Sequence, residues 1–156
     1  MALWGEPQWA VVGDTFVVGC QPDPSIVFAD QFVDNPDANT AAYQTKHGIY
    51  SPHVGLDNVT MSWGHDEYLY QVLKHNKSSL PKEALGAIRY HSFYPWHTSG
   101  AYEHLANEHD AAMLPWVQEL NKFDLYSKAD ELPDIEKLKP YYQGLVDKYC
   151  PGVLKW

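Results

Sequence analysis

Apolar positions are spaced differently in two parts of the chain. Up to about residue 57 they are interrupted by Pro, Gly, Asp and Asn, whereas beyond that point they recur at intervals of three and four. Such intervals place apolar side chains on one face of a helix. The sequence therefore predicts a mainly α fold, a helical bundle with an irregular N-terminal third.

The first predicted helix begins near Asn58, in the segment NVTMSWGHDEYLYQVLKHN. Its apolar positions lie near helical spacing: Val59, Met61, Trp63, Tyr68, Leu69, Val72 and Leu73. Asp57 or Asn58 can cap this helix, because a short polar side chain there accepts hydrogen bonds from free backbone N–H groups. A helix from Asn58 onward is therefore expected.

A second helix is expected to start at residues 78–81 and to run to about His91. Pro81 fits its first turn, because the N–H group that proline lacks is not needed there. Pro95 follows and stops the helix.

Two more helices complete the predicted bundle. One covers residues 102–125, and Pro115 either kinks it or divides it in two. The other covers residues 134–149, with a break at Pro140 and an end before Pro151. No repeat, low-complexity tract or linker interrupts the chain, so we expect one domain over residues 1–156.

The N-terminal third predicts little regular structure. The stretch QWAVVGDTFVVG alternates weakly and turns at Gly13 and Asp14, which indicates a short β-hairpin or an ordered loop. Residues 21–39 contain three prolines and predict an extended loop.

Composition narrows the function classes. Of 156 residues, 45% are hydrophobic and 20% are charged, which is typical of a globular domain. The net charge of −9, with no Lys/Arg cluster, argues against nucleic-acid and anionic membrane partners. Cys20 and Cys150 indicate no disulfide scaffold, and the first residues lack the pattern of a signal peptide. We therefore expect a soluble cytoplasmic protein.

Histidines are the first candidates for chemistry, since the chain has eight. His65 and His91 each lie on a predicted helix beside aromatic residues, and two histidines on adjacent helices can converge on one metal. Asp124, in NKFDLYSK, adds a carboxylate, and histidine with carboxylate suits iron. From spacing alone, ordinary core or surface histidines remain the commoner explanation.

His65 is followed by Asp66, which matches the dipeptide of HD metal-dependent hydrolases. A match of two residues arises easily by chance. The alternative is that Asp66 caps the helix or pairs on its surface.

Two further pairs could bind a polyol. Asp124 and Lys128 are four residues apart and would share a helix face, either as a binding pair or as an ordinary surface ion pair. Gly13 and Asp14 could aim a backbone N–H group and a carboxylate at a ligand, or form only a tight turn.

Taken together, five blocks of the sequence resemble the myo-inositol oxygenase family: GEPQWAVVGDTF, NVTMSWGHDEYLYQVLK, HSFYPWH, AMLPWVQELNKFDLYSK and LKPYYQGLVDKYCPG. They are long, stand in the family's order and cover nearly the whole chain. The resemblance implies an all-α fold related to HD-domain proteins. It also implies a non-haem di-iron centre that cleaves myo-inositol with O₂ to give D-glucuronate.

The resemblance assigns roles to individual residues. His65 and His91 match the ligands of the iron that the inositol diol chelates, and Asp124 matches a ligand of the other iron. Contacts to inositol are implied for a second set of residues: Gly13, Asp14, His91, Ser92 and Lys128.

The family also has an N-terminal half, with further His and Asp ligands, that this sequence does not match. We therefore expect the chain to be the C-terminal part of an inositol oxygenase and to be a monomer. With an incomplete ligand set it should bind iron weakly and turn over little inositol, because affinity depends on ligand number and charge. Two alternatives are a non-catalytic helical remnant that binds a partner and a phosphohydrolase of the HD superfamily.

Overall fold

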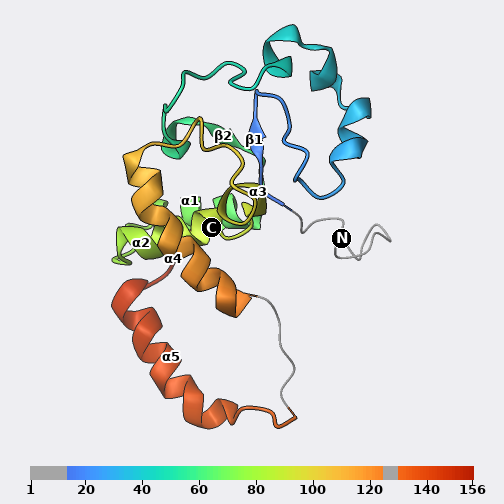
Figure 1. The fold of residues 1–156 in the computed structure, drawn as a ribbon. Coiled ribbons are helices and arrows are strands. Elements are labelled where there is room, and N and C mark those ends of the chain that lie inside the picture. The colour runs from blue at the N-terminus through green and yellow to red at the C-terminus, as the bar shows by residue number, and fades with distance from the viewer. Residues whose placement is uncertain (1–13, 125–129) are drawn as a thin grey trace.

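The computed structural model describes residues 14–124 and 130–156 and is mainly helical, as predicted (Figure 1). Its α-helices are, in chain order, α1 (His65–His75), α2 (Lys82–Tyr90), α3 (Tyr94–His97), α4 (Glu108–Asp124) and α5 (Ile135–Tyr149). Helix α1 packs against α2, and α2 packs against α4.

A short sheet joins the N-terminal region to the residues before α1. Strand β1 (Val17–Val18) pairs antiparallel with β2 (Thr60–Met61), so that Val17 lies opposite Met61. The second arm of the predicted hairpin is thus a strand, but its partner is a segment far along the chain. The first arm of that hairpin, residues 8–13, lies outside the described residues.

The extended loop predicted for residues 21–39 is only partly extended. It contains the 3-10 helices η3 (Ala29–Asp34) and η4 (Pro36–Asn39), and η5 (Ala41–Gln44) follows. The side chain of Asn35 accepts a hydrogen bond from the backbone N–H of Asp37 and so caps η4. Pro36 occupies its first turn, where proline is favoured. Pro36 thus starts a short helical turn and does not keep the chain extended.

Helix α1 starts later than predicted. It begins at His65 behind Gly64, and neither Asp57 nor Asn58 caps it. Val59 and Met61 are buried, but Thr60 between them is exposed, which is the two-residue alternation of a strand. The predicted start was wrong because Val59 and Met61, which were counted as part of the helical pattern, belong to the alternating pattern of a strand.

Helix α2 begins directly after Pro81, as predicted, and His91 caps its C-terminal end. Helix α4 begins at Glu108 and not at Tyr102, because Tyr102 has a φ of 61°, a left-handed conformation that no α-helix contains. Pro115 lies within α4 and does not divide it.

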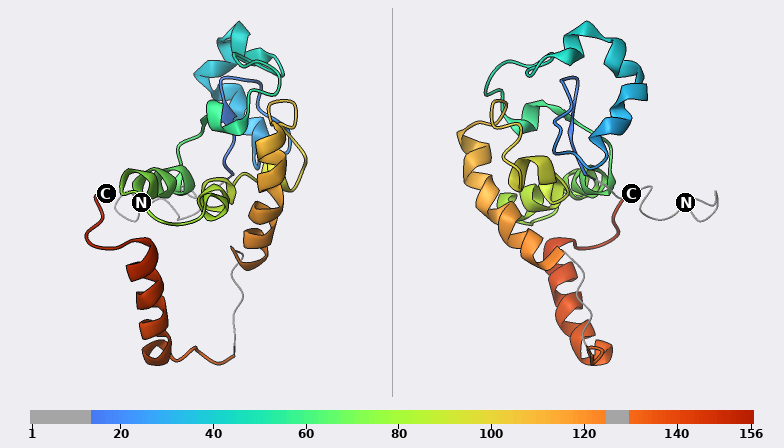
Figure 2. Two further views of the ribbon diagram at one scale, coloured as in Figure 1. Left: turned by 90° about the vertical axis from the view of Figure 1, so that its left-hand side faces the viewer. Right: turned by 45° about the vertical axis from the view of Figure 1, so that its right-hand side comes forward.

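The C-terminal helix covers nearly the predicted residues, but the predicted break at Pro140 was wrong, because Pro140 lies inside a continuous helix. The Asp134 side chain accepts a hydrogen bond from the backbone N–H of Lys137 and caps α5. Helix α5 projects away from the other helices and approaches them only near its C-terminal end (Figure 2). There the carbonyl of Tyr149 accepts hydrogen bonds from the backbone N–H of Ser79 and the hydroxyl of Ser78.

One hydrophobic core lies among β1, β2, α3, α4 and the end of α2. Its buried members are Val17, Cys20, Leu56, Val59, Met61, Tyr90, Phe93, Trp96, Ala101, Tyr102, Leu105, Met113 and Val117. Cys20 and Cys150 are both free thiols. Among the helices in residues 14–124 and 130–156, none has the length and apolar character needed to cross a membrane.

Candidate metal and polyol site

The strongest feature of the site is a pair of facing imidazoles. His65 is the first residue of α1 and His91 follows the last residue of α2, so the contact between the two helices brings the rings together. Their Nε2 atoms lie 2.9 Å apart, with the ring planes inclined at 76°. The sequence-based pairing of these two residues therefore has a geometric basis.

The tautomer of His91 is fixed by its surroundings. Its Nδ1 lies 2.7 Å from the carbonyl oxygen of Ile88, and because a carbonyl only accepts, Nδ1 must carry the proton. In the neutral ring the lone pair is then on Nε2, directed at His65. A backbone carbonyl that orients a ring nitrogen in this way is the usual support of a metal-binding histidine.

The distance between the two Nε2 atoms can be compared with the distances expected for two imidazoles bound to one metal ion. Metal–imidazole bonds of about 2.1 Å place two nitrogens about 3.0 Å apart at a right angle and about 3.4 Å apart at a tetrahedral angle. The observed 2.9 Å fits a right angle. The same distance also fits a hydrogen bond, for which His65 must carry its proton on Nε2.

Ser92 lies beside the pair. Its side chain is buried, and its Oγ is 3.4 Å from Nε2 of His65. Its backbone carbonyl accepts a hydrogen bond from the N–H of Thr15 at 2.8 Å. The sequence-predicted residues His65, His91 and Ser92 are therefore in direct contact.

Asp66 does not lie on the helix surface, which corrects that expectation. Its side chain is fully buried, and its Oδ2 accepts a hydrogen bond from the hydroxyl of Thr15 at 2.5 Å. Its Oδ1 has no hydrogen-bond partner among the residues that the structure describes. A Cβ atom on Gly64 would lie 2.7 Å from this oxygen, which explains the glycine before α1. Asp66 thus ties the segment around Thr15 to α1.

Asp14 is next to Thr15 and is half-buried. Its Oδ2 accepts a hydrogen bond from the backbone N–H of Val27 at 2.9 Å. Gly13, predicted to bind substrate with it, lies outside the described residues, as does Lys128.

Asp124 is the last residue of α4, and its side chain is exposed. The hydroxyl of Tyr94 donates to its Oδ2 at 3.4 Å. Burial raises the pKa of Tyr94, and the carboxylates of Asp124 and Asp14 add to that effect, so the phenol stays protonated as a donor.

His97 is a site residue that the sequence analysis missed. It lies in the same block as His91, HSFYPWH, and its Nε2 donates to the backbone carbonyl of His91 at 2.9 Å. Burial lowers the pKa of His97, while the charges of Asp14 and Asp124 act in the opposite direction. His97 is therefore a neutral donor that fixes the backbone of His91.

The sequence contained a hint of the roles of Tyr94 and His97, because both residues closely follow His91 in the block HSFYPWH. Short helix α3 (Tyr94–His97) turns them toward Asp124 and the backbone of His91. Asp124 thus lies beside α3. Yet no three or more His, Cys, Asp or Glu side chains of residues 14–124 and 130–156 converge as a metal cluster. The contact that resembles part of a metal site is therefore the pair formed by His65 and His91.

Comparisons with known proteins agree on one family. The sequence model of the family described as "Myo-inositol oxygenase" matches residues 1–156. The chain is 67% identical to the inositol oxygenase of Mus musculus and 65% identical to that of Homo sapiens, in both cases over the whole chain and 55% of that protein. It is 58% identical to the inositol oxygenase of Dictyostelium discoideum, over 97% of the chain and 52% of that protein. The chain thus spans about half the length of these relatives.

Proposed function

The chain belongs to the myo-inositol oxygenase family, and from this premise we propose that it forms part of a di-iron site that cleaves myo-inositol with O₂ to give D-glucuronate. The observation that carries the proposal is the 2.9 Å approach of the two Nε2 atoms of His65 and His91. In this proposal these imidazoles hold the iron that the inositol diol chelates.

The donor chemistry supports iron. Imidazole together with carboxylate is a ligand set of non-haem iron, and the 2.9 Å separation of the two Nε2 atoms would let both imidazoles bind one ion. When bound, the iron would supply Lewis acidity that favours the alkoxide form of the diol, and inositol itself would supply the electrons that reduce O₂. His91 is held for this task by Ile88 and His97, through its ring and its backbone respectively.

The polyol is bound by groups that match its hydroxyls. Myo-inositol is uncharged, so specific binding needs donors and acceptors for each buried hydroxyl, since an unpaired one costs about 1–3 kcal/mol. Ser92 can donate or accept beside His65, and the carboxylate of Asp14 accepts. Gly13 and Lys128 are proposed contacts on the basis of the resemblance alone.

Asp124 is the proposed ligand of the second iron. Among the described residues Asp124 forms no cluster of three ligand-type side chains with the histidine pair, and its hydrogen bond from Tyr94 suits a carboxylate that serves a different metal ion from the one at His65. Tyr94 would hold that carboxylate in place before the metal binds.

The proposal names only small partners, myo-inositol and O₂. The net charge of −9 disfavours nucleic acid and anionic membrane surfaces. A cytoplasmic monomer with an HD-related fold completes the proposal and depends on the family resemblance.

Isolated from any other polypeptide, the 156-residue chain should bind iron weakly and form little glucuronate. The described residues bring two neutral imidazoles to one metal position, and affinity rises with ligand number and charge. Glucuronate formation by this chain alone at the rate of a complete family member would contradict that expectation.

Linkage between iron and substrate provides the test. If inositol chelates the iron held by His65 and His91, each must tighten binding of the other by the same factor. We expect myo-inositol, but not the linear polyol mannitol, to lower the Kd for Fe²⁺ measured under argon. The effect should disappear in His91→Ala. An Fe²⁺ affinity that ignores myo-inositol would favour the alternative, a non-catalytic domain of the same fold.

A further inference from the structure

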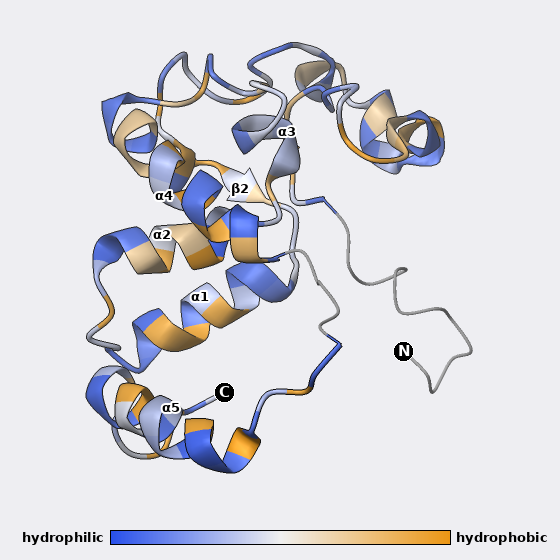
Figure 3. Ribbon diagram, turned by 60° about the horizontal axis from the view of Figure 1, so that its bottom comes forward, coloured by the Kyte–Doolittle hydropathy of each residue, from blue (hydrophilic) through white to orange (hydrophobic). Residues whose placement is uncertain are grey.

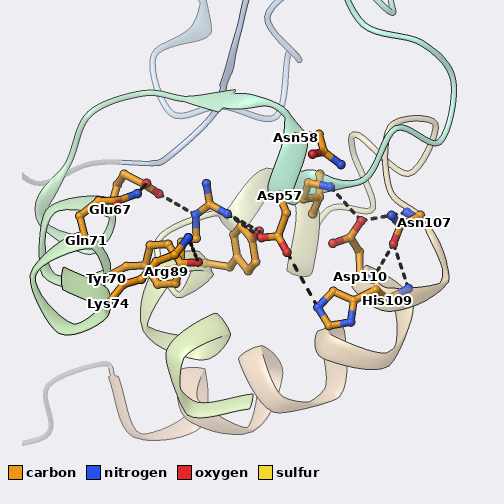
Figure 4. Close-up of polar contacts among 12 residues, drawn as sticks. Asp57, Asn58, Glu67, Tyr70, Gln71, Lys74, Arg89, Asn107, His109 and Asp110 are labelled. Carbon is orange, nitrogen blue, oxygen red and sulfur yellow. Dashed lines mark hydrogen bonds and ion pairs between the residues drawn. The ribbon is translucent and has the colours of Figure 1, made fainter. Parts of the chain in front are cut away.

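A buried arginine lies two residues before His91. Arg89 is 7% exposed, and its Nε donates to Oε2 of Glu67 at 2.7 Å (Figure 4). Its Nη1 donates to Oδ1 of Asp57 at 2.6 Å and to the hydroxyl of Tyr90 at 3.0 Å. Glu67 is equally buried. A guanidinium paired with two carboxylates thus lies in the interior, close to the proposed metal site.

The network is charged. The guanidinium of arginine stays protonated in proteins, so Arg89 is a cation between the carboxylates of Glu67 and Asp57. The ring of Tyr70 lies 4.8 Å from its Cζ, within range of a cation–π contact. Each polar partner of Arg89 therefore stabilises the same position of its side chain.

The ion pair and the histidine pair join the same two helices. His65 and Glu67 begin α1, while Arg89 and His91 end α2, so the two pairs define an antiparallel register. Residues two apart on a helix point about 200° away from each other. The two pairs therefore lie on different sides of the contact between α1 and α2. The histidines are on the more exposed side, and Glu67 and Arg89 are buried in the interior.

The interior side is anchored to other parts of the fold. Asp57, from the 3-10 turn η6 (Leu56–Asn58), also accepts from the hydroxyl of Tyr90 at 2.9 Å. Its other oxygen lies 4.0 Å from Nε2 of His109, near the start of α4. The position of Arg89 is therefore set by α1, by the turn before β2 and by α4 together.

We propose that Glu67 and Arg89 are positioning residues for the metal: their ion pair fixes the register of α1 against α2 and thereby the separation of His65 and His91. The inference rests on the proposed function in one respect, that these histidines hold a metal. Removing water from two charges is costly, so a buried ion pair adds little net stability compared with apolar residues. What it can add is one defined arrangement, and metal ligands are sensitive to shifts of less than 1 Å.

Replacing both charges separates positioning from stability. The double variant Glu67→Met with Arg89→Met leaves no unpaired charge in the interior, since Asp57 is largely exposed. A matched control removes the exposed ion pair of Glu119 and Lys122 on α4, as Glu119→Gln with Lys122→Gln. The probe is Cu²⁺ alone, because it binds nitrogen sites most tightly among first-row divalent ions.

Electron paramagnetic resonance of the full 156-residue chain reports how many imidazoles bind the copper. In the unchanged chain we expect a two-nitrogen signal that His65→Ala removes. In the Glu67/Arg89 double variant the Kd for Cu²⁺ should rise about tenfold or more, the usual effect of losing groups that orient ligands. The signal should fall to one nitrogen while the melting temperature without metal changes little. The control should match the unchanged chain.

A second variant protects the test against misfolding. Arg89→Lys keeps the charge but lacks the planar fork that joins Glu67 to Asp57, and it should weaken Cu²⁺ binding in the same direction but less. Unchanged affinity and an unchanged two-nitrogen signal in both variants would overturn the positioning role alone. Absence of the two-nitrogen signal from the unchanged chain would overturn the metal site and the positioning role together.

Discussion

Helices α2 and α5 are both amphipathic, yet they differ in what their apolar faces contact. Helix α2 buries Ala87 and Tyr90 between α1 and α4, whereas none of the 15 residues of α5 is buried. On α5 the side chains of Ile135, Tyr141 and Val146 are each more than half exposed. Figure 3 shows apolar positions, in orange, along α5.

The difference teaches which part of the molecule supports the site. His65, His91 and Ser92 all lie on or beside α1 and α2, within the packed region. A helix gains most of its stability from an apolar face packed on the rest of the protein. Helix α5 has its cap at Asp134 and hydrogen bonds at its C-terminal end, but little packing. The site should therefore be insensitive to changes in α5 and sensitive to changes in the core.

The largest difference between the core and α5 is expected in the free energy of unfolding when a leucine in each is replaced by alanine. Leu105→Ala removes a side chain with 0% exposure from the core and should lower the free energy of unfolding by about 2–5 kcal/mol, through lost burial and a cavity. Leu138→Ala on α5, where the side chain is 39% exposed, should change it by about 0.5 kcal/mol or less. Urea unfolding of the two variants measures both. Equal losses would show that α5 is packed as tightly as the core.

The two cysteines give the next contrast. Burial raises the pKa of Cys20 from 9.0 to about 11, which reduces its thiolate about a hundredfold at pH 8. Iodoacetamide should therefore modify Cys150, after α5, much faster than Cys20, as mass spectrometry can measure. Because the unfolded chain ionises this thiol from about pH 9 and the folded chain only near 11, stability should also fall as pH rises through that range. Equal alkylation rates at pH 8 would contradict the burial of Cys20.

A smaller contrast involves two helical glycines. A Cβ atom on Gly86 of α2 would lie 2.5 Å from Sδ of buried Met113, whereas a Cβ on Gly144 of α5 meets nothing within 4 Å. Gly86→Ala should destabilise the protein by about 1 kcal/mol, because crowding outweighs the gain in helix propensity. Gly144→Ala should stabilise α5 by up to about 1 kcal/mol. Thermal unfolding followed by circular dichroism should give shifts of opposite sign, and shifts of the same sign would undermine the contrast.

Local signals account for what the sequence predicted well. Pro81 before α2 and Asp134 before α5 mark helix starts through backbone chemistry that acts within one turn. The start of α1 was missed because Met61 pairs with Val17, a partner far away in sequence that no local pattern reveals. The positive φ of Tyr102, which delays α4, likewise depends on tertiary packing.

The contact between the candidate ligands His65 and His91 could be predicted from the sequence, but the groups that hold them in place could not. His65 and His91 carry recognisable chemistry, and their meeting follows from two adjacent helices. The role of His97 depends on a hydrogen bond to a backbone carbonyl, and that of Asp66 on burial against Thr15. Neither contact has a sequence period or motif, since both are set by the tertiary fold.

The central claim, that His65 and His91 share one metal ion, is tested most directly by a double-mutant cycle on Fe²⁺ affinity under argon. Two ligands of one ion act as a unit, so their losses are not additive. We expect His65→Ala and His91→Ala each to weaken binding, the double variant to lose little more than either, and His75→Ala, at the far end of α1, to bind as the unchanged chain does. Losses that multiply in the double variant, or an equal loss in His75→Ala, would contradict the claim.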